Sequence, residues 1–169
     1  MPAFGLFVLA STANAEKLSI KGLEIGTPKA EMNERLKAGF ASCNNIGDTC
    51  TWLHANYGKR SVVVVADLIE EKICRVSVIF SEEDSIYLGQ GLVEKFGEPQ
   101  TKNNQTLVNG FGVKYSSLVF LWRNGNETLK FSQRSGRIDE GQIVLSDRAC
   151  EAKFLAKDAN ETKTAADEM

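Results

Sequence analysis

The stretch SLVFLWRNGNETLKFSQR, residues 117–134, decides the fold because it predicts an antiparallel hairpin. Asn124-Gly125 interrupts two apolar, alternating runs, and this pair accepts the positive φ angles of a two-residue hairpin turn. Centring the turn on the pair makes Arg123 face Asn126 and places Phe120 opposite Leu129. The hairpin then presents one apolar face, formed by Leu118, Phe120, Trp122, Leu129 and Phe131.

Four further segments carry strand patterns around this hairpin. The β-branched run SVVVVADL at 61–68 is typical of a strand at the centre of a sheet. KICRVSVIFS at 72–81 alternates, so that one face carries Cys74, Val76, Val78 and Phe80. Residues 51–56 (TWLHAN) and 141–147 (GQIVLSD) predict two shorter strands, and the polar segment 100–116, between the second predicted helix and the hairpin, predicts a long loop.

Three segments carry helix patterns. In residues 25–40, Thr27 is the expected N-cap and Pro28 suits the first turn, and an apolar stripe recurs every four residues, at Met32, Leu36 and Phe40. Residues 81–99 begin with Ser81 and Asp84 at capping-box spacing and repeat apolar residues at Leu88, Leu92 and Phe96. Residues 148–159 predict a C-terminal helix.

The order of these segments predicts the α+β class. We expect one antiparallel sheet with helices packed on one face, arranged as two αβββ repeats, followed by the C-terminal helix. Each predicted repeat has one tryptophan early in its first strand, Trp52 and Trp122, which favours an internal duplication. Residues 16–158 then form a single domain, and the polar residues 159–169 form a flexible tail.

The N-terminal fifteen residues carry no charge and resemble a signal peptide. An apolar run from Phe4 to Ala10 is followed by the small-x-small tripeptide Ala13-Asn14-Ala15, which predicts cleavage after Ala15. No Lys or Arg precedes the run, so either translation starts upstream of Met1 or the segment is an N-terminal core strand. The run is far shorter than the roughly 20 apolar residues that span a bilayer, and no later segment reaches that length.

The four cysteines agree with export to the periplasm or beyond the cell, where thiols are oxidised. Four cysteines allow three pairings. Cys43 and Cys50 flank a turn-rich loop, which favours a local Cys43–Cys50 bridge and leaves Cys74 to pair with Cys150. The alternative is a zinc site, but the chain has no Cys-x-x-Cys pair and a single histidine, so we expect no metal.

Composition excludes several classes of partner and cofactor. The net charge is −2, and no basic stripe or RNA- or DNA-binding motif occurs, so nucleic acid is a poor candidate. The Gly-x-Gly of Gly89 and Gly91 lies inside a predicted helix and does not follow a strand, so we expect no nucleotide cofactor and, more generally, no cofactor.

Catalytic patterns are sparse. His54 could serve as a general base, but no Gly-x-Ser-x-Gly motif accompanies it. Glu82, Glu83 and Asp84 are better explained by the helix N-terminus than by a pair of catalytic carboxylates. The aromatic residues could form a recognition patch on the sheet. The alternative interpretation is that they pack in the core and at its rim. The predicted binding surface joins the 100–116 loop with Trp52, His54, Tyr57, Tyr115 and Trp122.

GLEIGTPKAEMNERL at 22–36 and LVEKFGEP at 92–99 resemble the helix starts and ends of small exported bacterial domains with the β-lactamase-inhibitor-protein-like fold. That group includes the small lipoproteins of outer-membrane assembly, although here Glu16, and not cysteine, follows the predicted cleavage site. The resemblance implies helices on one face of an antiparallel sheet and a protein that works by binding.

The sequence thus predicts an exported, non-enzymatic binding module of the bacterial cell envelope. Its partner would be a protein or an envelope component, contacted through a sheet face and the 100–116 loop. The alternative is a small periplasmic hydrolase that uses His54 with a carboxylate.

Overall fold

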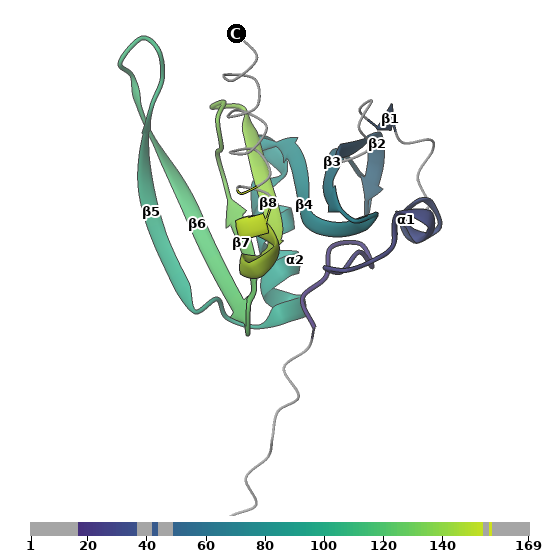
Figure 1. Ribbon diagram of the computed structural model, residues 1–169. Coiled ribbons are helices and arrows are strands. Elements are labelled where there is room, and N and C mark those ends of the chain that lie inside the picture. The colour runs from purple at the N-terminus through teal and green to yellow at the C-terminus, as the bar shows by residue number, and fades with distance from the viewer. Residues whose placement is uncertain (1–16, 37–41, 44–48, 154–155, 157–169) are drawn as a thin grey trace, which may run out of the picture.

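Eight antiparallel strands form one sheet in the computed structural model, which describes residues 17–36, 42–43, 49–153 and 156 (Figure 1). The strands are β1 Ser42–Cys43, β2 Thr49–Tyr57, β3 Arg60–Ile69, β4 Lys72–Ser81, β5 Thr101–Val108, β6 Lys114–Asn124, β7 Glu127–Ser132 and β8 Glu140–Asp147. The helices are α1 Lys29–Leu36 and α2 Ser85–Phe96, with a 3-10 turn at Glu82–Asp84 and helical residues at 148–153.

The strand order β1-β2-β3-β4-β8-β7-β6-β5 divides the sheet into two similar halves. In each half a helix is followed by four strands that pair in sequence, and the last strands of the halves, β4 and β8, pair antiparallel at the centre. The predicted α+β class is confirmed. Each half has one strand more than expected, because residues 42–43 form β1 and residues 101–108 form β5.

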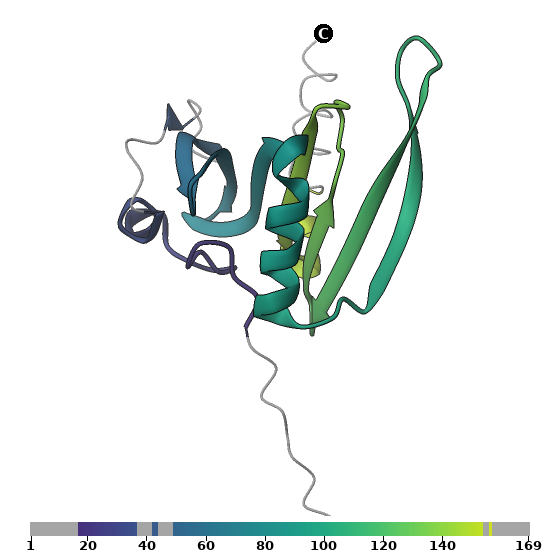
Figure 2. The same ribbon diagram turned by 180° about the vertical axis from the view of Figure 1, so that it is seen from behind.

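The helices α1 and α2 pack on the same face of the sheet, as predicted. Met32 and Leu36 of α1 and Leu88 and Leu92 of α2 are buried in one apolar cluster with the core side chains of the strands. The helical residues 148–153 lie on the other face, behind the sheet when α2 is in front (Figure 2). The sheet is therefore covered on both faces near its centre.

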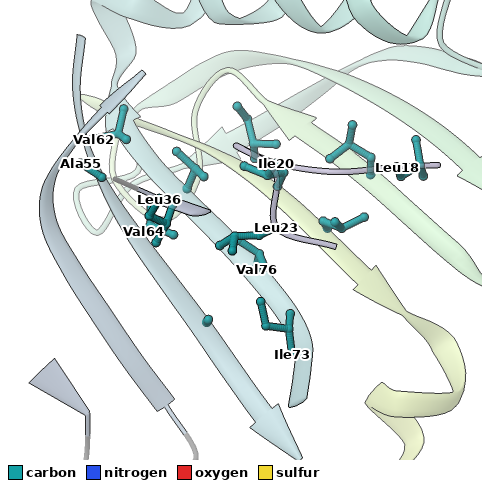
Figure 3. Packing of buried hydrophobic residues seen from close by; sticks show 14 of the residues in the cluster. Leu18, Ile20, Leu23, Leu36, Ala55, Val62, Val64, Ile73 and Val76 are labelled. Atoms are coloured by element: carbon teal, nitrogen blue, oxygen red, sulfur yellow. The ribbon is translucent and has the colours of Figure 1, made fainter. Parts of the chain in front are cut away.

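The segment before α1 completes the core in a way that the sequence patterns did not reveal. Leu18, Ile20 and Leu23 are buried against the sheet, and Leu23 lies beside Val76 and Ile73 (Figure 3). Ile20 and Leu23 exchange two backbone hydrogen bonds of 2.8 and 2.9 Å, which fold the segment into a tight turn. This irregular segment covers the centre of the sheet between the two helices.

Both disulfides form as predicted. Cys43 pairs directly across β1 and β2 with Cys50, and Cys74 bonds to Cys150 in the C-terminal helix. One detail was wrong, because Cys74 does not share the core face with Val76. The β3–β4 register skips Cys74, and Ile73 joins the apolar cluster in its place. This bulge frees Cys74 to bond with the helix on the opposite face.

The predicted helix caps do not form. The Thr27 hydroxyl accepts a hydrogen bond from the backbone N–H of Glu24, at 3.2 Å, and neither Ser81 nor Asp84 caps a helix with its side chain. Asp84 binds Arg60 at 3.0 Å and Glu82 binds Arg134 at 2.8 Å. The cations that bind these carboxylates come from β3 and from the segment after β7, and the spacing of residues along the helix does not reveal such contacts.

The β6–β7 hairpin forms, but its register differs from the prediction by two residues. Asn124 pairs with Glu127, so that Gly125 and Asn126 are the turn residues and Phe120 faces Phe131. Gly125 has a φ of 59°, and glycine at the first central position is typical of a type II′ turn. A shift by two residues preserves the faces, so the predicted apolar set remains on the core side.

Three predictions fall on residues that the structure does not describe, namely the signal peptide at 1–15, the place of Phe40 in the first helix stripe, and the flexible tail at 159–169. Among the described helices, none has the length and apolar character needed to cross a bilayer. The two disulfides indicate an oxidising environment, as in the periplasm or outside the cell.

Candidate functional site

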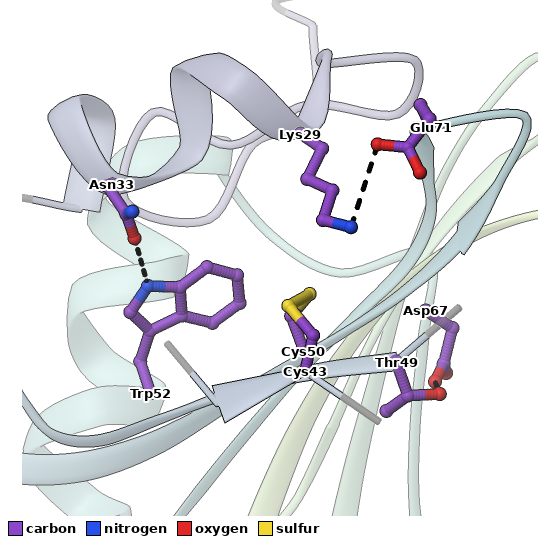
Figure 4. Close-up of a disulfide and its surroundings, with 8 residues drawn as sticks. All are labelled: Lys29, Asn33, Cys43, Thr49, Cys50, Trp52, Asp67 and Glu71. Atoms are coloured by element: carbon purple, nitrogen blue, oxygen red, sulfur yellow. Dashed lines mark hydrogen bonds and ion pairs between the residues drawn. A yellow bond between two sulfur atoms is a disulfide. The ribbon is translucent and has the colours of Figure 1, made fainter. Parts of the chain in front are cut away.

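Trp52 and Trp122, both predicted on the binding surface, belong to the core. Each side chain is 2% exposed. The Trp52 indole N–H donates to Asn33 of α1 at 2.7 Å, whereas that of Trp122 donates to the carbonyl of Gly97 directly after α2, at 2.9 Å (Figure 4 shows the first bond). The alternative of core packing therefore holds for both, and each indole fixes the helix of its own half to the sheet.

His54 is exposed and lies apart from Trp52, on a bulge of β2. The β2–β3 register shifts between Trp52 and Ala55, and His54 adopts a φ of 56°. The bulge breaks the alternation that predicted a common face for Trp52 and His54. The His54 ring meets the Ser61 hydroxyl, with 3.3 Å between Nδ1 and Oγ, beside an open groove of about 370 Å³ that Asp139 and Glu140 also line.

The two tyrosines of the predicted surface lie in different places. Tyr57 ends β2 and packs against the core, where burial and the neighbouring Tyr87 raise the pKa of its phenol. Tyr115 belongs to β6, and its hydroxyl accepts a hydrogen bond of 3.2 Å from the side-chain amide of Asn109. The five predicted residues therefore do not form one surface.

The segment 100–116, predicted as a loop, is mostly strand. Residues 101–108 form β5, which pairs with β6 over eight consecutive residue pairs, and only residues 109–113 connect the two strands. Its polar side chains misled the prediction, because a strand exposed on both faces lacks the apolar alternation of a half-buried one. The β5–β6 hairpin stands at the margin of the molecule, well away from the helices at its upper end (Figures 1 and 2).

The tip of this hairpin carries exposed apolar side chains, and its turn is held by hydrogen bonds. Val108, Phe111 and Val113 are 60%, 94% and 49% exposed. Asn109 organises the turn, because its side-chain oxygen accepts hydrogen bonds from the backbone N–H groups of Phe111 and Val113, at 3.0 and 2.9 Å. We call Val108, Phe111 and Val113 the tip cluster. The tip cluster is a set of exposed apolar side chains on a hydrogen-bonded turn.

Two hollows of about 170 and 460 Å³ lie between α2 and β6, on the side of the hairpin. Both are bounded by Gly89, Gln90 and Phe120. Gly89 permits this close packing, because a Cβ there would lie 3.3 Å from the Phe131 ring. The rim of the larger hollow carries charges of both signs, from Glu94, Glu98 and Lys102.

The cysteines leave no thiol for metal binding, since all four are in disulfides. Within the described part of the chain, no group of three or more His, Cys, Asp or Glu side chains is arranged to hold a metal ion.

Sequence patterns identified the segment that carries the tip cluster, but not the cluster itself. The apolar residues in VNGFGV, at 108–113, are the signal that could have located it, because glycines beside an aromatic residue favour a tight and exposed turn. Comparison with protein families, curated proteins and solved structures found no significant match to this chain.

Proposed function

We propose that the protein is an exported, non-enzymatic binding module of the bacterial cell envelope, which recognises a protein or an envelope component through its β5–β6 hairpin. The observation that carries this proposal is the tip cluster, in which Phe111 is 94% exposed. The two disulfides support an oxidising compartment.

The physical argument concerns the cost of exposing apolar surface. Isolated exposed apolar residues are common, but here three lie within six residues at the tip of one hairpin, which makes a local apolar patch. Such a patch gains free energy when a partner covers it, because apolar area leaves water. Since Asn109 already holds the turn, little backbone entropy is lost on binding.

The flanking strand adds polar groups for recognition. All side chains of β5 except Leu107 are exposed, and most are amides or hydroxyls. An apolar centre with a polar margin is the usual anatomy of a protein-binding surface. The larger hollow beside α2 extends this surface toward Phe120.

Site-specific photo-crosslinking tests the proposal. A benzophenone amino acid replaces Phe111 in cells of a bacterial host that exports the protein, and the matched control carries it in place of Ile138, which is 43% exposed between β7 and β8. We expect adducts with another molecule from position 111 and none from position 138. Equal labelling from both positions, or no adduct from position 111, would refute recognition by the tip.

One observation favours the alternative, a hydrolase. His54 Nδ1 and Ser61 Oγ are 3.3 Å apart beside an open groove, which is the contact expected between a base and a nucleophile. No carboxylate is hydrogen-bonded to the His54 ring among the residues that the structure describes, so the predicted partner of His54 has no direct contact with it. Ester hydrolysis that is lost in His54→Ala and retained in Phe111→Ser would favour the enzyme.

A further inference from the structure

The strand β5 is the last strand of the sheet on one side, and no described strand pairs with its outer edge. Seven of its eight residues are exposed, and Leu107 is half-buried. Along such an edge, every second residue directs its backbone N–H and C=O away from the sheet, where they can bind another strand.

This edge lacks the features that usually prevent strand pairing. β5 contains no proline, and Lys102 is its single charged residue. Its register with β6 is continuous from Thr101↔Leu121 to Val108↔Lys114, so that no bulge bends the edge away. The opposite edge of the described sheet, β1, has two residues and is bridged to β2 by the Cys43–Cys50 disulfide.

We propose that β5 pairs antiparallel with β5 of a second copy of this chain. Two identical strands side by side in one antiparallel sheet are related by a two-fold axis perpendicular to it. Such an axis brings one residue opposite its own copy. Three consecutive amides, Asn103, Asn104 and Gln105, occupy the middle of β5.

A side-chain amide is suited to the position on the axis. It both donates and accepts hydrogen bonds, so that it can bind the identical group, whereas a charged side chain would repel its copy. With Asn104 on the axis, Lys102 faces Thr106, and with Gln105 on the axis it faces Val108. Neither register places a charge opposite a like charge.

The pairing closes at two copies. Each chain offers one long and regular free edge in its described part. On the opposite side β1 covers only Cys50 and Thr51 of β2, and the rest of that edge is interrupted by the bulge between Trp52 and Ala55. This inference goes beyond the proposed function. Because paired strands run in opposite directions, the two tip clusters lie at opposite ends of the shared edge. The dimer therefore presents the tip cluster twice, and it would bind a surface that carries repeated targets with avidity.

Sedimentation velocity on the chain with intact disulfides tests the proposal. We expect the wild-type protein to sediment as a dimer and the variant N104K/Q105K to sediment as a monomer, because it places lysines opposite each other in either register. The variant N104E/Q105E should also be a monomer, and mixing the two variants should restore a dimer. Since both residues are exposed, the variants should retain the far-UV spectrum of the wild type.

The matched control L53K/N56K adds the same charge at two exposed positions of β2 and should remain a dimer. A monomeric wild-type protein, or a dimer that persists in N104K/Q105K, would overturn the pairing. Phe111→Ser should keep the dimer while it abolishes recognition by the tip. A monomeric wild-type protein that still forms adducts from position 111 would contradict only the strand pairing. A dimer that forms no adduct from position 111 would contradict only recognition by the tip.

Discussion

Glu127, the first residue of β7, illustrates a cost that a single side chain imposes on the fold. Burial raises the pKa of this carboxyl above its ordinary value of 4.5, and the nearby Asp147 and Glu24 raise it further. The Lys17 ammonium opposes this effect. The folded protein therefore holds the Glu127 proton more tightly than the unfolded chain does, and the stability from this group falls as the pH rises past 4.5.

Replacing Glu127 with Gln should raise the free energy of unfolding at neutral pH, because the amide is never charged. The gain should disappear below pH 4.5, where the wild-type carboxyl is also protonated in both states. Urea unfolding at a series of pH values measures the difference. Lys17→Met should lower the free energy of unfolding at neutral pH, because it removes the cation that stabilises the charged carboxylate. A gain in Glu127→Gln that does not depend on pH would contradict this account.

The turn between β3 and β4 has a geometry that its residues, Glu70 and Glu71, do not favour. The charged pair Glu70-Glu71 joins β3 to β4, with φ values of 52° and 58°. Positive φ at both positions is typical of the turn that Asn-Gly usually forms. The strands on either side fix this geometry, since Ile69 pairs with Lys72, and so the register of the sheet overrides the preference of the turn residues.

At the scale of elements, α2 depends on one apolar stripe. Leu88 and Leu92 are each 1% exposed, whereas Ile86 on the same helix is 71% exposed. Periodicity in the sequence predicted this stripe correctly. The contacts that hold the ends of the helices, such as Trp122 to Gly97, join residues distant in sequence and could not be predicted.

Leu92→Ala should lower the free energy of unfolding by about 2 to 5 kcal/mol, because it removes buried methyl groups and leaves a cavity. Ile86→Ala on the same helix should change it by less than about 0.5 kcal/mol, as expected for an exposed position. Thermal and urea denaturation of the two variants measures the contrast. Similar losses in both variants would show that α2 is not buried along the predicted stripe.

At the scale of the whole molecule, the two disulfides constrain very different lengths of chain. Cys43 and Cys50 are 7 residues apart, whereas Cys74 and Cys150 are 76 apart and join the central strand β4 to the helix on the opposite face. A longer closed loop restricts the unfolded chain more strongly. The long bridge should therefore contribute more to stability.

Replacing both Cys74 and Cys150 with Ala should lower the free energy of unfolding by about 4.5 kcal/mol, against about 2.5 kcal/mol for Cys43 and Cys50, in the chain-entropy model. Denaturation of both double variants without reductant gives the comparison. Equal losses, or a greater loss for the short bridge, would contradict the loop-length argument.

The sequence by itself determined the α+β class and the helix stripes, because these depend on periodicity. It also indicated the pairing of the cysteines, since the short spacing of Cys43 and Cys50 favours a local bridge and leaves Cys74 for Cys150. Tertiary structure alone decided that His54 leaves the face of Trp52, that both tryptophans are buried, and that residues 101–108 are a strand. Bulges, edge position and burial arise from pairing between distant segments, and no local pattern of side chains records them.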